Sequence, residues 1–128
     1  MRFLTTYVHG ILDYIVGAAL IVAPNIFGFS EVGGMAVLLP RVLGVAAIVV
    51  SLLTNYGWGL MKVIPMPVHL GIDFFSGALL AASPWLFGFA TQPENAWMPH
   101  VVFGLAEILV VFVSQREPGQ RIAARSRS

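Results

Sequence analysis

The sequence predicts an all-α membrane protein in which four transmembrane helices form two parallel helical-hairpin repeats. Hydrophobic residues make up 58% of the chain and charged residues only 10%, whereas about a quarter of the residues in soluble domains are charged. Four apolar stretches each approach the ~20 residues that cross a bilayer core. The chain also matches itself at an offset of 60 residues, which indicates an internal repeat.

The spans are expected at residues 4–23, 34–54, 66–83 and 96–114. They are too long for strands and lack the alternation of polar and apolar residues that strands show. Pro24 and Pro84 should end the first and third spans, because proline has no N–H to donate. We expect one transmembrane domain at residues 1–115, with repeats at about 4–58 and 64–115, and a basic tail at 116–128.

Basic residues predict which way the chain crosses the membrane. Arg2, Lys62 and the arginines of the tail fall on one side, while Glu31 and Glu94 lie in the connections on the other. Basic residues favour the cytoplasmic side, so both termini should be cytoplasmic. Aromatic residues near the span ends are expected to anchor the interfaces, and these are Phe27, Phe29, Trp85, Phe87, Phe89 and Trp97 outside and Tyr56 and Trp58 inside.

The 60-residue match includes polar, glycine and proline positions, which shared hydrophobicity alone does not explain. Each copy contains two spans, so both copies enter the membrane from the same side and should be related by an axis along the membrane normal. In the first span and part of the second, the matched residues include Val8, His9, Asp13, Gly17, Pro24, Phe27, Gly28, Phe29 and Gly44, against Val68, His69, Asp73, Gly77, Pro84, Phe87, Gly88, Phe89 and Gly104.

The third span closes on Ser83-Pro84-Trp85, followed by a Phe-Gly-Phe sequence. With His69 and Asp73 upstream, this motif resembles the signature of the SPW-repeat family of prokaryotic integral membrane proteins, over roughly residues 8–114. The first copy departs from the motif because it reads Ala-Pro-Asn at 23–25. The resemblance implies a multi-pass protein of the prokaryotic plasma membrane and assigns no catalytic residue.

Ionisable residues inside the spans are the candidate site. Such groups are costly in hydrocarbon, so they should face the bundle interior and pair with one another. His9 and Asp13 are four residues apart, as are His69 and Asp73, so each pair shares one helix face. The remaining candidates lie on polar stripes of the second and fourth spans, with Arg41, Gly44 and Ser51 on one and His100, Gly104, Glu107 and Ser114 on the other. Arg41 is expected to approach the carboxylates and neutralise them.

Three interpretations of this intramembrane polar cluster remain open. The groups can fix the helices in register through hydrogen bonds and ion pairs. They can instead form a proton or ion relay, since histidines and carboxylates titrate near neutral pH. If the two repeats converge, His9, Asp13, His69 and Asp73 also offer nitrogen and oxygen ligands for zinc or another divalent ion.

The preferred function is a small structural, assembly or accessory membrane protein. A proton- or ion-coupled transport module is the first alternative, and a membrane metal-binding protein or enzyme is the second. No phosphate loop, nucleophile elbow or zinc-protease motif occurs, so we expect no enzyme activity, no catalytic residue, no cofactor and no resident metal. The expected partners are the lipid bilayer and a second copy of the chain or another membrane protein, and no nucleic acid.

Overall fold

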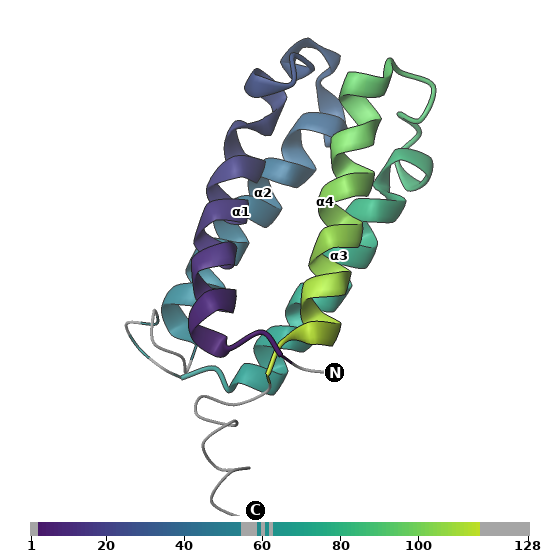
Figure 1. Cartoon of the computed structure of the whole chain (residues 1–128). Helices are drawn as coiled ribbons and strands as arrows, with labels where there is room; N and C mark the ends of the chain where they lie inside the picture. Colours follow the sequence, from purple (N-terminus) through teal and green to yellow (C-terminus); the bar gives the residue numbers. More distant parts are fainter. Residues whose placement is uncertain (1–2, 55–58, 60, 62, 116–128) are drawn as a thin grey trace, which may run out of the picture.

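The computed structural model describes residues 3–54, 59, 61 and 63–115. Within them the chain forms the helices α1 (Thr6–Ile26), α2 (Gly34–Leu53), α3 (Met66–Leu86) and α4 (Glu94–Val113), with a short 3₁₀ helix, η1 (Ser30–Val32), between α1 and α2. Figure 1 shows α1 and α3 running in one direction and α2 and α4 in the other. Each long helix is long and apolar enough to cross a membrane, which confirms the predicted all-α membrane fold with four spanning helices.

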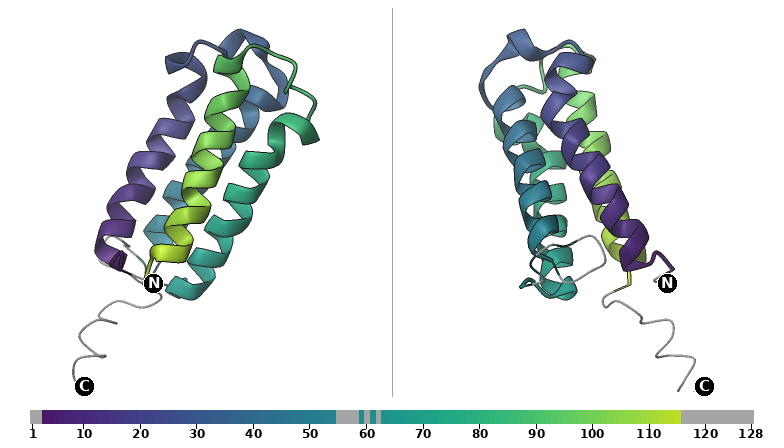
Figure 2. Two further views of the ribbon diagram at one scale, coloured as in Figure 1. Left: turned by 45° about the vertical axis from the view of Figure 1, so that its right-hand side comes forward. Right: turned by 90° about the vertical axis from the view of Figure 1, so that its left-hand side faces the viewer.

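The helices pack in sequential pairs, α1 with α2 and α3 with α4. Figure 2 shows that α1 and α4 lie on one side of the bundle and α2 and α3 on the other. Small residues allow each pair to cross closely. A Cβ atom added to Gly44 would lie 2.5 Å from the carbonyl oxygen of Gly17, and one added to Gly104 would lie 2.5 Å from that of Gly77.

Two backbone bridges close the bundle at the end where α1 starts and α4 finishes, and they are related by the same 60-residue offset. Leu4 pairs with Ser114 in an isolated backbone bridge, and Ile64 pairs with Thr54 in another. The first bridge ties the start of α1 to the end of α4, and the second ties the end of α2 to the start of α3. α1 and α3 therefore each begin beside the hydroxyl residue that follows an antiparallel neighbouring helix.

The prediction that Pro24 and Pro84 end their helices is wrong, because α1 continues two residues further, to Ile26, and α3 likewise continues to Leu86. Proline removes one upstream hydrogen bond, to the carbonyl four residues earlier, and residues after it can stay helical. In α3 the Ser83 hydroxyl donates to that carbonyl, Leu80 O, at 2.6 Å. Ser83 thus replaces the donor that Pro84 lacks.

A glycine turn ends both of these helices. Gly28 and Gly88 have φ of 74° and 75°, a conformation that costs glycine little. The amide of Phe89 donates to Pro84 O at 2.8 Å, the six-to-one bond of a Schellman motif. The turn folds Phe89 back into the bundle, where it is buried, as is its counterpart Phe29.

The predicted aromatic anchors therefore separate into two groups. Phe27, Phe87 and Trp85 are exposed, as anchors should be, and Trp97 is half-buried, whereas Phe29 and Phe89 are core residues and their assignment as anchors is wrong. Other predictions concern residues outside the described ranges, namely Arg2, Tyr56, Trp58, Lys62 and the tail at 116–128. The orientation that rests on those basic residues remains a prediction.

Candidate functional site

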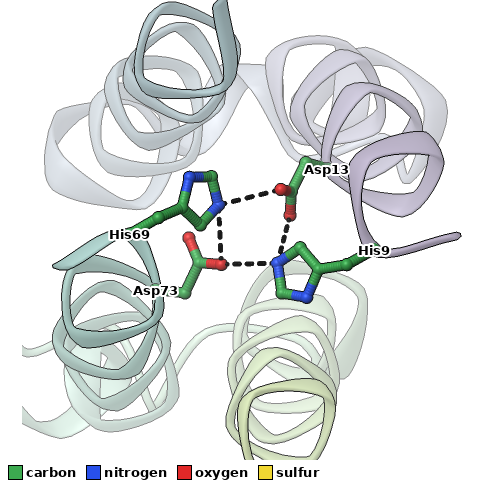
Figure 3. Close-up of side chains that lie close together, drawn as sticks. All are labelled: His9, Asp13, His69 and Asp73. Atoms are coloured by element: carbon green, nitrogen blue, oxygen red, sulfur yellow. Dashed lines mark hydrogen bonds and ion pairs between the residues drawn. The ribbon is translucent and has the colours of Figure 1, made fainter. Parts of the chain in front are cut away.

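His9 and Asp13 of α1 meet His69 and Asp73 of α3 at the centre of the bundle (Figure 3). A helix turns once in 3.6 residues, so side chains four apart point the same way. The glycine crossings hold α2 and α4 close to their partners, and this leaves α1 and α3 facing each other across the interior. The structure thereby brings both predicted pairs into one site, which we call the His/Asp ring.

Histidine and aspartate alternate around the His/Asp ring. His9 Nε2 lies 3.1 Å from Asp13 Oδ1 and 2.9 Å from Asp73 Oδ2. His69 Nε2 lies 2.8 Å from Asp13 Oδ2 and 3.1 Å from Asp73 Oδ2. Each histidine of the ring therefore contacts both carboxylates, one on its own helix and one on the other.

A hydroxyl group sets the orientation of each imidazole. The Thr54 hydroxyl donates to Val50 O at 2.6 Å and lies 2.6 Å from His69 Nδ1. Since its only hydrogen goes to the carbonyl, the hydroxyl oxygen must accept from Nδ1–H. Ser114 does the same for His9, with Nδ1 at 2.6 Å and Val110 O at 2.5 Å. Both Nδ1 atoms are thus donors, and both Nε2 atoms point at the carboxylates.

The His/Asp ring is shielded from the surroundings of the bundle. The side chains of His9 and His69 are 0% and 1% exposed, and those of Asp13 and Asp73 are 13% and 16% exposed. Carboxylates at this depth need compensating charge or hydrogen bonds. The ligand atoms of all four residues lie within 4.8 Å of one another, which is close enough for one cation to satisfy them together.

Arg41 does not join the His/Asp ring, so its predicted role in neutralising the carboxylates is wrong. Its guanidinium donates to Asn25 Oδ1 at 2.9 Å, near the end of α1 that is far from the ring. Arg41 lies near the start of α2, and α2 runs antiparallel to α1, so this residue is at the opposite end of the bundle. Lying on the polar stripe of its helix therefore does not bring Arg41 to the level of the ring carboxylates.

His100 is also separate from the ring. Its Nε2 donates to Ala36 O at 2.8 Å, and its imidazole packs against the rings of Phe29 and Phe89, with centroids 5.4 and 4.7 Å away. This residue joins the buried turns at the far end of the bundle. Its role in the described structure is packing.

Glu107 lies close to the ring without belonging to it. It lines a cavity of about 170 Å³ together with Asp13 and Asp73. Its Oε2 is buried and has no hydrogen-bond partner among the described residues. The expectation that Glu107 lies near the level of the two aspartates therefore agrees with the structure.

Sequence reasoning placed Ser114 on a polar stripe but missed Thr54. The signal was present, because Thr54 and Ser114 are 60 residues apart and both carry a hydroxyl group. Matching hydroxyls in a repeated sequence are easily read as helix-end residues. Only the fold shows that each one contacts the histidine of a neighbouring helix.

Over the described residues, the fold and site together define a membrane protein of four spanning helices with a buried histidine and aspartate ring. A family model described as the SPW repeat domain matches residues 7–114. The chain therefore belongs to the SPW repeat family, as its motif suggested. No curated protein and no solved structure matches the chain.

Proposed function

We propose that this protein is a small structural membrane protein whose His/Asp ring binds one divalent transition-metal ion, with Zn²⁺ as the best-suited ion. The observation that carries the proposal is the convergence of four buried ligand residues within 4.8 Å. The bound ion would fasten α1 to α3 and so join the two helical pairs. This assignment combines the structural role expected from the sequence with the metal alternative.

The ligand set suits zinc chemically. Imidazole nitrogens and carboxylate oxygens are both ligands that Zn²⁺ accepts in proteins, with bonds of about 2.0–2.2 Å, and four of them complete a tetrahedral shell. Such bonds place neighbouring ligand atoms about 3.3 Å apart, whereas the ring contacts measure 2.8–3.1 Å. An opening of a few tenths of an ångström would admit the ion.

The hydroxyl contacts support the same assignment. A metal-binding histidine commonly donates its other ring N–H to a neighbouring acceptor, which fixes the ring and its tautomer. Ser114 accepts from His9 and Thr54 accepts from His69, each at 2.6 Å. The Nε2 atoms are therefore aimed at the ring centre before any ion arrives.

Charge supports a divalent ion over a monovalent one. Two carboxylates and two neutral imidazoles carry a charge of −2, which one divalent cation cancels. A neutral site is the least costly arrangement inside a bilayer. Four protein ligands also complete a tetrahedral shell, as in structural zinc sites, whereas catalytic sites keep one position open. We therefore propose a structural role and no enzyme activity.

The test is metal binding by the purified protein in nanodiscs. We expect one Zn²⁺ per chain by elemental analysis, and an intense visible absorption of tetrahedral Co²⁺ when cobalt is added. His9→Asn and His69→Asn should each abolish both signals. His100→Asn is the matched control, because it removes a buried histidine outside the ring and should retain them. A wild-type protein that binds neither ion, with its helices intact by circular dichroism, contradicts the proposal.

The cellular setting is part of the same proposal. We propose a prokaryotic plasma-membrane protein with both termini in the cytoplasm, on the basis of Arg2, Lys62 and the arginine-rich tail. A reporter that is active only in the cytoplasm should be active when fused to either terminus, and a reporter that is active only outside the cytoplasm should be inactive at both. A second copy of the chain is the expected partner, and a monomeric mass in native mass spectrometry from nanodiscs would contradict that expectation.

A further inference from the structure

A cavity of about 170 Å³ opens between α1 and α4 at the level of the His/Asp ring. Ala106 on its wall is exposed, so the cavity faces the surface that these two helices present to lipid. The end of the bundle that holds the start of α1 is closed, because Leu4 N donates to Val113 O and Gln115 N donates to Leu4 O, each at 2.8 Å. Among the described residues, access to the cavity is therefore lateral, from the hydrocarbon of the bilayer.

The size of the cavity suits a single ring or a short alkyl chain. A cavity of about 150 Å³ engineered into a protein core is large enough to bind benzene. Leu12 and Val16 of α1 and Phe103 and Val110 of α4 form apolar walls, and Phe103 offers an aromatic surface against which a ring can pack. A ligand that reaches this cavity through lipid must itself be small and lipophilic.

The polar side chains of the cavity wall define what such a ligand must carry. Among the described residues that line the cavity, they are the carboxyl groups of Asp13, Asp73 and Glu107. The two aspartates face the ring imidazoles at 2.8–3.1 Å, whereas Glu107 Oε2 is buried with no hydrogen-bond partner among the described residues. A buried oxygen without a partner is costly, and three carboxyl groups disfavour an anion. The ligand should therefore bring a hydrogen-bond donor that can carry positive charge.

Glu107 belongs to the second repeat alone. The equivalent residue of the first repeat is Ala47, which lies on the same cavity wall, so a helical pair forms without a carboxyl group at this position. The base of the Glu107 side chain lies at the crossing of α3 and α4, where a Cβ atom added to Gly77 would be 3.0 Å from Glu107 Cβ. This crossing holds the side chain where its carboxyl group reaches the cavity. Pairing of the helices therefore does not by itself explain Glu107.

We propose that the cavity binds a small lipophilic primary amine, which enters from the bilayer between α1 and α4 and pairs with Glu107. A neutral amine enters hydrocarbon far more readily than a charged group does. A carboxyl group and a neutral amine together have the same composition as a carboxylate and an ammonium group, so the ion pair forms by transfer of one proton with no change in total charge. Such a charge-assisted pair is about twice as strong as a hydrogen bond between neutral groups, and it gives Oε2 its partner.

Equilibrium dialysis of the protein in nanodiscs against benzylamine tests the site, with protein-free nanodiscs of the same lipid as the reference. We expect one benzylamine per chain above the reference. Benzyl alcohol, which has nearly the same shape but no basic nitrogen, should bind about tenfold more weakly, because a hydrogen bond to a charged group is stronger than one between neutral groups. Wild-type protein that binds no benzylamine above the reference overturns the proposal.

The role of Glu107 is tested by Glu107→Gln in the same assay. The variant should bind benzylamine about tenfold more weakly, because the charged partner of the amine is lost. Glu94→Gln is the matched control, since it removes a carboxyl group at the other end of α4, and it should bind benzylamine as the wild type does. Equal benzylamine binding by Glu107→Gln and the wild type would show that the amine does not pair with this residue.

Entry from lipid is tested with a variant that narrows the opening. Ala106→Phe adds a bulky side chain on the cavity wall, and Ala46→Phe adds the same side chain at the equivalent exposed position of the first repeat, outside the cavity lining. The first variant should lose most of its benzylamine binding, and the second should retain it. Equal binding by the two variants contradicts the lateral opening.

Amine binding does not rest on the metal proposed for the His/Asp ring. His69→Asn should lose Zn²⁺ and retain benzylamine, because it leaves Glu107 and the cavity lining in place. A wild type that binds Zn²⁺ but no benzylamine contradicts the amine site alone. One that binds benzylamine but no Zn²⁺ contradicts the metal ring alone.

Discussion

Thr54 and Ser114 determine which nitrogen of each ring histidine faces the carboxylates. Each hydroxyl donates its hydrogen to a helix carbonyl and accepts a hydrogen bond from Nδ1. The distance from the hydroxyl oxygen to Nδ1 is 2.6 Å in both cases. A neutral imidazole cannot place a second hydrogen on Nε2. Between each Nε2 and its carboxylates there must then lie either a further proton or a cation, which is why these two hydroxyls are informative about function.

Removing either hydroxyl should weaken the metal site. We expect Thr54→Val and Ser114→Ala each to lower Zn²⁺ affinity by about 10–100-fold, the usual effect of losing the group that orients a ligand histidine. The two losses should be similar because the two contacts are equivalent. Competition with a zinc-sensitive dye measures the affinities.

Ser51→Ala is the control for this experiment. Ser51 is as buried as Thr54 and Ser114, but its Oγ has no hydrogen-bond partner among the described residues. Its removal should leave the zinc affinity unchanged. A loss in Ser51→Ala equal to that in Ser114→Ala would mean that general packing, and not histidine orientation, sets the affinity.

At the scale of the helix, two devices shape the bundle. Glycines allow the backbones of each helical pair to cross closely, and a serine beside Pro84 lets α3 continue past its proline. The Ser83 hydroxyl donates to Leu80 O at 2.6 Å, the carbonyl that loses its usual N–H donor to Pro84. The serine and the proline of the family motif are thus explained together, because the serine supplies the hydrogen bond that the proline cannot. The tryptophan of the motif, Trp85, is exposed and packs near Trp97, with ring centroids 6.4 Å apart.

The close crossings predict a strong dependence on glycine. Gly44→Ala and Gly104→Ala should each destabilise the bundle by about 1–3 kcal/mol, since the new methyl group would meet backbone atoms that cannot move aside. Gly71→Ala is the control, because a Cβ there meets no atom within 4 Å; it should be neutral or stabilising by about 0.5–1 kcal/mol. Denaturation in mixed micelles measures the differences, and equal effects at all three positions would contradict the crossing argument.

The hydroxyl donor beside the proline can be removed in the second repeat, at Ser83, and added in the first, at Ala23. Ser83→Ala should cost about 1 kcal/mol, because the buried Leu80 carbonyl loses its hydroxyl donor. Ala23→Ser adds the same hydroxyl beside Pro24 and should stabilise α1 by a similar amount. The same denaturation assay compares both variants, and a neutral Ser83→Ala would show that the carbonyl finds another donor.

At the scale of the whole molecule, the two helical pairs meet at the His/Asp ring. α1 contacts α2 far more than it contacts α4, and α3 packs mainly on α4. Hydrophobic driving force between helices is weak in a lipid environment. A cation bound by α1 and α3 together is therefore a natural fastener between the pairs.

Metal removal should loosen the bundle as a whole. Saturation at 100 times the dissociation constant adds about 2.7 kcal/mol of stability, so chelation should lower the melting temperature of the purified protein measurably. His69→Asn should melt at one temperature with or without Zn²⁺. A wild-type melting temperature that does not change with Zn²⁺ or chelator would argue that the ring holds the pairs together by hydrogen bonds alone.

Most of the architecture was predictable from the sequence because its causes are local. Bilayer thickness sets the length of an apolar span, and helical periodicity puts His9 with Asp13 and His69 with Asp73 on common faces. The 60-residue repeat placed the two pairs in equivalent positions. Helix ends near the prolines were less predictable, because a side chain such as Ser83 can replace the missing donor.

Tertiary structure decides which candidate residues belong to the His/Asp ring. Arg41 and His100 share polar stripes with other candidates but lie at the opposite end of the bundle, while Thr54 joins the ring from the end of a neighbouring helix. Sequence spacing determines the face on which a side chain lies. Which faces meet, and at what level, depends on how the glycine crossings and end bridges align four separate helices, and that alignment exists only in the folded bundle.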